Sequence, residues 1–100
     1  MTDCLFCKMV NKEIPTEIVY EDQDVLAFKD IAPKAPVHIL IIPKKHIENV
    51  AAATAEDCKV LGKIQAVAKQ LAEEFGIAES GYRILTNSGK DSGQVVFHLH

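Results

Sequence analysis

Apolar residues recur at helical spacing in one long segment of the chain. They form a single stripe within residues 55–75, made of Val60, Leu61, Ile64, Val67, Ala68, Leu71 and Phe75. Thr54 is suited to the N-cap position, and Asp57, three residues later, completes a capping box. Gly76 stands where a left-handed residue ends a helix. The pattern therefore predicts one amphipathic helix over residues 55–75.

Short runs of β-branched and aromatic residues predict strands on both sides of this helix. They cover residues 18–20, 25–29, 37–42, 82–86 and 95–100. The run at 37–42 is apolar enough to be a central strand, and residues 4–12 predict a short helix or turn that ends before Pro15. Strands that flank one helix without regular βαβ alternation are typical of an α+β domain with an antiparallel sheet.

Composition limits the range of functions. The chain has 100 residues, 48% of them hydrophobic and 25% charged, and a net charge of −3. This is enough for one domain, and the acidic balance argues against nonspecific nucleic-acid binding or an anionic membrane as partner. We expect a cytoplasmic protein, because its three cysteines are a poor disulfide framework and no secretory signal is recognisable.

The pair Cys4 and Cys7 has the C-x-x-C spacing. Half of a zinc site is the favoured interpretation, with a redox pair and coincidence as alternatives, because no strand precedes Cys4 as a thioredoxin-like motif requires. A tetrahedral site needs two further nitrogen or sulfur ligands. The sequence alone does not choose them among its histidines, which are His38, His46, His98 and His100.

His98 and His100 lie two residues apart in an apolar run. On a strand, such residues point to the same side at about 7 Å, so we expect both imidazoles to face one pocket. The preceding residues 87–94 are rich in Gly, Asn, Ser and Gln. These residues suit a loop that binds an anion through backbone N–H groups, although ordinary turns use the same types.

The segment from Gly93 to His100, GQVVFHLH, resembles the signature of the histidine triad family, His-φ-His-φ-His-φ-φ with φ apolar. Other segments agree in order along the chain: CLFCK at 4–8, EIP at 13–15, LAFKDI at 26–31, and HILIIPKKH at 38–46. The resemblance covers essentially the whole chain and is strongest to the branch of nucleoside phosphoramidate hydrolases that keeps a zinc site. It implies an α+β fold with a five-stranded antiparallel meander, one long helix and a short N-terminal helix, in a homodimer whose sheets join.

The same resemblance implies a role for each site residue. His100 matches the nucleophile, which attacks the α-phosphorus of a purine nucleoside 5′-phosphoramidate and forms a nucleotidyl-histidine intermediate. A closed structural zinc site would use Cys4, Cys7, His46 and His98. The residues implied to bind the nucleotide are Phe28 and Ile31 at the base, Asp30 at the ribose, Asn87, Gly93, Gln94 and Val95 at the phosphate, and His38 beside the active-site histidines.

Two departures from the family pattern stand out. The third triad histidine does not occur, so we expect residues 1–100 to be a single domain cut inside its last strand. Val95 is apolar where hydrolase relatives often place a polar group near the leaving group. Two other functions stay open at this point. One is a dinucleoside polyphosphate hydrolase or nucleotidyl transferase of the same superfamily, and the other is a non-catalytic module that binds a nucleotide or a partner.

Overall fold

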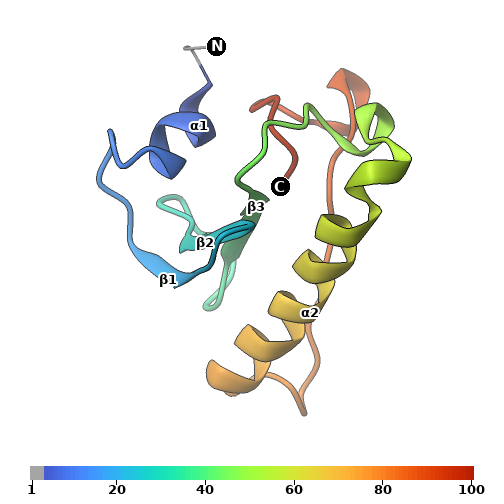
Figure 1. The fold of residues 1–100 in the computed structure, drawn as a ribbon. Helices are drawn as coiled ribbons and strands as arrows, with labels where there is room; N and C mark the ends of the chain where they lie inside the picture. The colour runs from blue at the N-terminus through green and yellow to red at the C-terminus, as the bar shows by residue number, and fades with distance from the viewer. Residues whose placement is uncertain (1–3) are drawn as a thin grey trace.

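The computed structural model describes residues 4–100 (Figure 1). The helices are α1 (Leu5–Val10) and α2 (Cys58–Glu74), and the strands are β1 (Ile18–Glu21), β2 (Val25–Lys29) and β3 (Ile39–Pro43). Three short 3-10 turns complete the described elements: η1 (Val50–Ala52), η2 (Ala55–Asp57) and η3 (Lys90–Ser92). The predicted short N-terminal helix and long helix are thus confirmed.

The sheet is antiparallel, in the order β1-β2-β3, and one helix packs on each of its faces. The protein has two hydrophobic clusters, one on each face of the sheet. The side chains of β2 contribute to them in alternation, since neighbouring residues of a strand face opposite sides. Val25 and Ala27 belong to the cluster under α2, whereas Leu26 and Phe28 pack with Phe6 of α1. All four β2 residues are buried, so β2 is the central strand of this sheet. The expectation that residues 37–42 form a central strand is wrong for the described sheet, where β3 lies at an edge.

The predicted capping box lies at η2, the turn that leads directly into α2, and the predicted glycine follows the end of α2. The Asp57 carboxylate accepts a hydrogen bond from the Thr54 backbone N–H at 2.8 Å and an ion pair from Lys45 at 2.7 Å. Gly76, two residues beyond α2, has φ +74°, which glycine adopts without steric cost. The apolar stripe of α2 buries Ile64, Val67 and Leu71 against the sheet.

The two predicted C-terminal strands, 82–86 and 95–100, are not strands among the described residues, so the sheet has three strands and not five. Side-chain pattern selects an extended backbone, but a strand also needs a neighbour whose N–H and C=O groups complete a ladder. Leu99 N–H donates to Ile47 O at 2.7 Å, yet no ladder extends from this bond. Leu99 is nevertheless 3% exposed and packs in the α2 core, so it anchors the segment that carries both neighbouring histidines.

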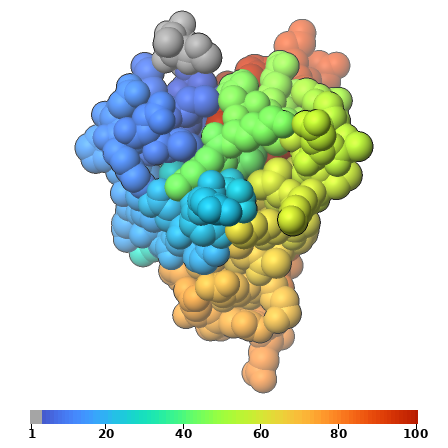
Figure 2. All heavy atoms as spheres, viewed as in Figure 1, coloured from blue at the N-terminus to red at the C-terminus, as the bar shows by residue number. Residues whose placement is uncertain are grey.

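Within residues 4–100, no helix is long and apolar enough to cross a membrane. The end of the molecule opposite the C-terminus of α2 gathers segments from distant parts of the chain. Figure 2 shows residues near the N-terminus and residues near 40–50 flanking this end, with C-terminal residues between them. Cys4, Cys7, His46, His98 and His100 lie in these segments.

Candidate active site and metal centre

Four side chains from three parts of the chain meet at this end of the molecule. One ligand atom from each of Cys4, Cys7, His46 and His98 lies within 4.8 Å of the others. Cys4 Sγ is 3.3 Å from His98 Nδ1, and Cys7 Sγ is 3.3 Å from His46 Nδ1. The two histidine Nδ1 atoms are 3.2 Å apart. The structure thus selects His46 and His98 from the four histidines as partners of the cysteine pair.

These separations are those of a metal tetrahedron. Zinc bonds of about 2.05 Å to nitrogen and about 2.3 Å to sulfur imply about 3.3 Å between two nitrogens and about 3.6 Å between nitrogen and sulfur. The observed nitrogen–nitrogen separation is 3.2 Å, and the nitrogen–sulfur separations for His98 are 3.3 and 3.6 Å. The cluster can therefore hold a metal ion without a change of scaffold.

A backbone carbonyl fixes the ring of His98. The imidazole is fully buried, and its Nε2–H donates to Pro43 O at 2.8 Å. The remaining nitrogen, Nδ1, then carries the lone pair that faces the cluster, which is the second-shell arrangement of a metal-ligating histidine. Burial is the main cause that lowers the pKa of His98, so the ring is neutral and able to ligate at pH 7.

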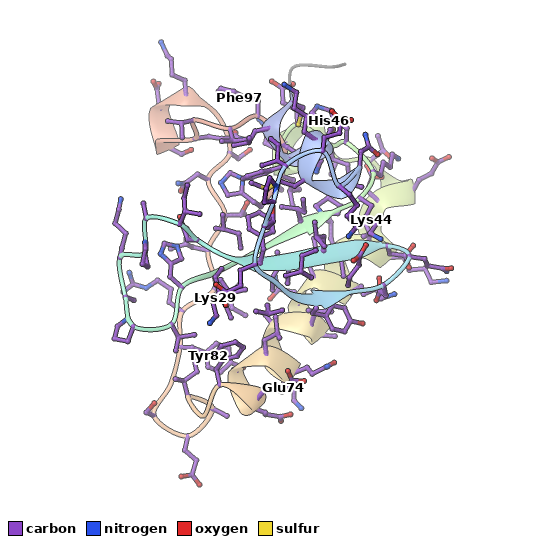
Figure 3. The ribbon with its side chains drawn as sticks, turned by 90° about the vertical axis from the view of Figure 1, so that its left-hand side faces the viewer. Lys29, Lys44, His46, Glu74, Tyr82 and Phe97 are labelled. Carbon is purple, nitrogen blue, oxygen red and sulfur yellow. The ribbon has the colours of Figure 1, made fainter. Side chains whose placement is uncertain are left out.

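Local structure positions the two cysteines. Cys4 is the N-cap of α1, and its Sγ accepts a hydrogen bond from the Cys7 backbone N–H at 3.3 Å. Burial, followed by the hydrogen bond to Cys4, raises the pKa of the Cys7 thiol to about 11. His46 follows β3, is exposed, and lies at the upper end of the view in Figure 3. The cluster is therefore buried at His98 and open to solvent at His46.

His100 has a defined tautomer. Its Nδ1–H donates to His98 O at 2.8 Å, so Nε2 carries the free lone pair. Its ring meets Phe6 edge-on, with centroids 5.1 Å apart, and Phe6 also contacts the His98 ring at 5.9 Å. The expectation that both imidazoles face one pocket is wrong. Both rings contact Phe6, but His98 belongs to the cluster with Cys4, Cys7 and His46, while His100 lines the neighbouring cavity.

The cavity beside His100 has a volume of about 250 Å³. Five predicted site residues line it, namely Phe28, Asp30, Ile31, Val95 and His100. Phe28 is buried in the floor of the sheet, whereas Ile31 and Val95 are 96% and 84% exposed. Large apolar side chains exposed beside a cavity are typical of a ligand-binding surface.

Asp30 and His38 form a pair at the start and end of the loop between β2 and β3. His38 Nε2 is 3.4 Å from Asp30 Oδ2, and His38 Nδ1 accepts from the Lys34 backbone N–H at 3.0 Å. The Nε2–H of His38 therefore faces the carboxylate. His38 is absent from the lining of the cavity that contains His100 and contacts Asp30, so its expected place beside the active-site histidines stays a prediction.

The glycine loop, residues 87–94, turns at two left-handed positions. Gly89 has φ +95° and Gly93 has φ +97°, and a Cβ at Gly93 would lie 4.0 Å from Asn87 Nδ2. Asn87 and Gly93 thus lie close together, and their expected contact with a phosphate stays a prediction. The Gln94 side chain points inward and is 4% exposed. The structure places it among backbone groups and away from the cavity lining.

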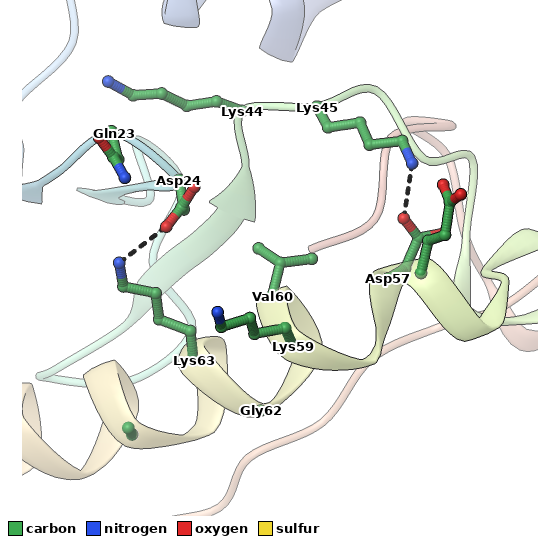
Figure 4. Close-up of a pocket in the computed structure, with 11 residues that line it drawn as sticks. Gln23, Asp24, Lys44, Lys45, Asp57, Lys59, Val60, Gly62 and Lys63 are labelled. Atoms are coloured by element: carbon green, nitrogen blue, oxygen red, sulfur yellow. Dashed lines mark hydrogen bonds and ion pairs between the residues drawn. The ribbon is translucent and has the colours of Figure 1, made fainter.

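A larger cavity, of about 740 Å³, lies between the β1–β2 turn and the N-terminal half of α2 (Figure 4). None of the predicted site residues lines it. Two of its lysines are paired with carboxylates that also line it, Lys63 with Asp24 at 3.0 Å and Lys45 with Asp57 at 2.7 Å. Volume alone therefore does not identify the site, because five predicted site residues line the smaller cavity.

Three contributors were not found from the sequence. Phe6 separates the two histidine rings, and its position between the cysteines is a signal that was available. Asn49 caps η1 and donates a hydrogen bond to Gln94, and only its residue type could have indicated this in the sequence. The Pro43 carbonyl that orients His98 is a backbone group, so no feature of the sequence could have indicated it.

The fold and site together define a small α+β protein in which a metal-ligand cluster stands beside a histidine with a free nucleophilic nitrogen. The family model described as "HIT domain" matches residues 11–100, and the chain belongs to this family. The resemblance stated from the triad signature is therefore confirmed.

Relatives and solved structures agree. The chain is 47% identical over 98 residues to the purine nucleoside phosphoramidase of Escherichia coli, covering 98% of this chain and 82% of that protein. It is 46% identical to Protein HitA of Neisseria gonorrhoeae, covering all of this chain and 92% of that protein. A HIT family hydrolase from Legionella pneumophila superposes with a TM-score of 0.96 at 47% identity, covering 98% of this chain and 88% of that one.

Proposed function

We propose that this protein hydrolyses purine nucleoside 5′-phosphoramidates through a nucleotidyl intermediate on His100, with a structural zinc ion on Cys4, Cys7, His46 and His98. The observation that carries the proposal is the orientation of His100. Its Nδ1–H is held by His98 O, which leaves the other nitrogen free to act as a nucleophile beside the cavity that Phe28, Asp30 and Ile31 line. The likeness to the E. coli purine nucleoside phosphoramidase supports the choice of substrate.

Substrate binding is assigned along the cavity. The Asp30 carboxylate accepts the two vicinal ribose hydroxyls, for which its acceptor-only chemistry is suited. His38 Nε2–H and the Ala32 backbone N–H, which donates to Asp30 Oδ1 at 2.9 Å, hold this carboxylate in place. Phe28 and Ile31 contact the base, and the backbone of Gly93 and Val95 with Asn87 surrounds the phosphate.

In the first chemical step, His100 Nε2 attacks the α-phosphorus. The bond between phosphorus and the His100 nitrogen forms while the bond between phosphorus and the leaving amine breaks, and the amine departs with a proton from water. The His98 carbonyl then faces an imidazolium whose Nδ1–H it already accepts, so the developing positive charge is stabilised without rearrangement.

In the second step, water attacks the same phosphorus. The bond to His100 breaks, the nucleoside monophosphate leaves, and the proton of the attacking water is released to solvent. His100 returns to the neutral form in which Nε2 is free. A neutral imidazole suits both steps, because it is a good nucleophile and also an acceptable leaving group.

The donor set explains the choice of metal. Two thiolates and two imidazoles in a tetrahedron are a closed structural site for zinc, with no position left for a reacting water. When bound, zinc supplies a cross-link between α1, the segment after β3 and the C-terminal segment. His98 then holds the backbone carbonyl that orients His100.

A homodimer with joined sheets is part of the proposal. Residues 82–86 have no ladder partner among the described residues, and three of their apolar side chains are 43–62% exposed: Tyr82, Ile84 and Leu85. An extended apolar segment with unpaired backbone groups is a template for pairing with a second copy. Sedimentation equilibrium should give twice the monomer mass, and Leu85→Asp should shift it towards the monomer.

Turnover of adenosine 5′-phosphoramidate tests the function. The full-length parent protein should release ammonia and AMP from this substrate. His100→Ala should lower kcat at least 1,000-fold while AMP still binds. Turnover of a diadenosine polyphosphate tests the alternative function, that of a dinucleoside polyphosphate hydrolase. A parent protein that binds AMP but turns over neither substrate would refute the proposal in favour of a binding module.

A further inference from the structure

The carboxamide of Gln94 uses all four of its hydrogen-bonding positions inside the protein. Nε2 donates to Glu48 O at 2.8 Å and to Val96 O at 3.0 Å. Oε1 accepts from Gly89 N–H at 2.8 Å and from Asn49 Nδ2 at 3.2 Å. Only one orientation of the amide satisfies two carbonyls and two donors, so the assignment of its nitrogen and oxygen is chemically fixed.

These four partners belong to the segments that build the site. Glu48 lies two residues after the metal-ligand histidine His46, and Val96 lies two residues before His98. Gly89 is the left-handed residue at which the glycine loop turns. One side chain therefore joins two of the three segments that carry metal ligands, those of His46 and His98, to the glycine loop.

A second set of bonds reinforces the same connection. Asn49, which donates to Gln94, caps η1 by accepting from the Ala52 N–H at 3.1 Å. The Ala51 N–H of this turn donates to the Ser88 hydroxyl of the glycine loop at 3.2 Å. The loop is thus tied to residues 48–51 from both of its ends.

A side chain with no free donor or acceptor has none to offer a phosphate. We propose that Gln94 is a positioning residue: it holds the glycine loop on the metal-bearing segments, and thereby sets the affinity for the nucleotide phosphate and couples it to metal retention. The proposal rests on the proposed function, since it takes the glycine loop as the phosphate site. It reassigns the Gln94 side chain from contact with the phosphate to support of the groups that make that contact.

The consequence is selective for the phosphate. Adenosine uses Asp30 and the base pocket, whereas AMP also uses the glycine loop. The dissociation constant of adenosine divided by that of AMP therefore isolates the contribution of the loop. Loss of an outer-shell partner in a metal site typically costs 10- to 100-fold in metal affinity or activity, and we take the lower end of this range as the scale for Gln94. We therefore expect Gln94→Met to lower this ratio about tenfold with the adenosine constant unchanged, and to speed zinc loss to a chelator by a similar factor.

Isothermal titration of the zinc-loaded protein with AMP and with adenosine is the experiment. Asn49→Ser is the second variant, because serine keeps a good N-cap while being too short to reach Gln94, and it should lower the ratio less. Gln65→Met is the matched control, an exposed glutamine on α2 given the same chemical change. It should leave both constants and the rate of zinc loss unchanged.

The outcomes separate the inference from the function on which it rests. A lower ratio in the Gln94 and Asn49 variants, with the control unchanged, supports the coupling. Equal loss of AMP and adenosine affinity, or no change in either, overturns it, since a purely structural role predicts no selectivity for the phosphate. A parent protein that binds AMP no better than adenosine would instead refute the proposed phosphate site itself. If Gln94→Met does not fold, the Asn49 variant decides by the same ratio.

Discussion

Removal of His46 should separate metal stabilisation from folding of the scaffold. The residue is exposed, and its Nδ1 lies 3.3 Å from Cys7 Sγ and 3.2 Å from His98 Nδ1. Without metal, His46→Ala should cost no more than about 0.5 kcal/mol, as for other surface substitutions. With zinc at 1,000 times its dissociation constant, the parent protein should gain about 4 kcal/mol, and Tm should rise by about 15–30 °C.

Thermal unfolding in zinc and in a chelator gives the four values needed. The parent should lose about 15–30 °C on chelation, whereas His46→Ala should unfold near the chelated parent under both conditions. His38→Ala is the matched control, since this histidine contacts Asp30 and should keep the full zinc effect. The reasoning fails if chelation leaves the parent unchanged, or if His46→Ala retains the zinc effect.

Three further predictions follow from single contacts. Zinc binding at pH 7 should release the Cys7 proton, because the pKa of this thiol is raised to about 11, and titration calorimetry in buffers of different ionisation enthalpy would show that release as a buffer-dependent heat. Asp57→Asn should lower Tm at pH 7. Since the Lys45 ammonium holds the pKa of Asp57 below 3.8, the difference in Tm from the parent should shrink as the pH falls below about 4. A difference in Tm that stays constant down to about pH 2 would contradict this. Leu99→Ala should cost about 3 kcal/mol in urea unfolding, because Leu99 is 3% exposed in the α2 core, and a cost below about 1 kcal/mol would show that it does not anchor the C-terminal segment.

The sequence predicted most elements that local signals define. The stripe from Val60 to Phe75, with Thr54 before it and Gly76 after it, located α2 because helix caps and helical periodicity are read from neighbouring residues. Residues 82–86 and 95–100 were misjudged for the converse reason. Their composition favours extended backbone, but a strand depends on a ladder with a distant partner, which local pattern does not contain.

The site was predictable as a set of residue types and not as a geometry. Spacing identified Cys4 and Cys7, and only the family resemblance implied His46 and His98, because their contacts with the cysteines span 39 and 94 positions. The Pro43 and His98 carbonyls that orient the two rings are backbone groups, and every residue type supplies one. The inward direction of Gln94 also depends on four partners from separate segments.

The central claim is that His100 carries the nucleotidyl group. The direct measurement is intact mass after rapid acid-free quenching of a single turnover with adenosine 5′-phosphoramidate, followed by fragmentation of the modified peptide. The account predicts a transient adduct of one adenylyl group on His100 that forms and decays at rates consistent with turnover, and that His100→Ala does not form. Turnover without this adduct, or an adduct on another residue, would contradict the account.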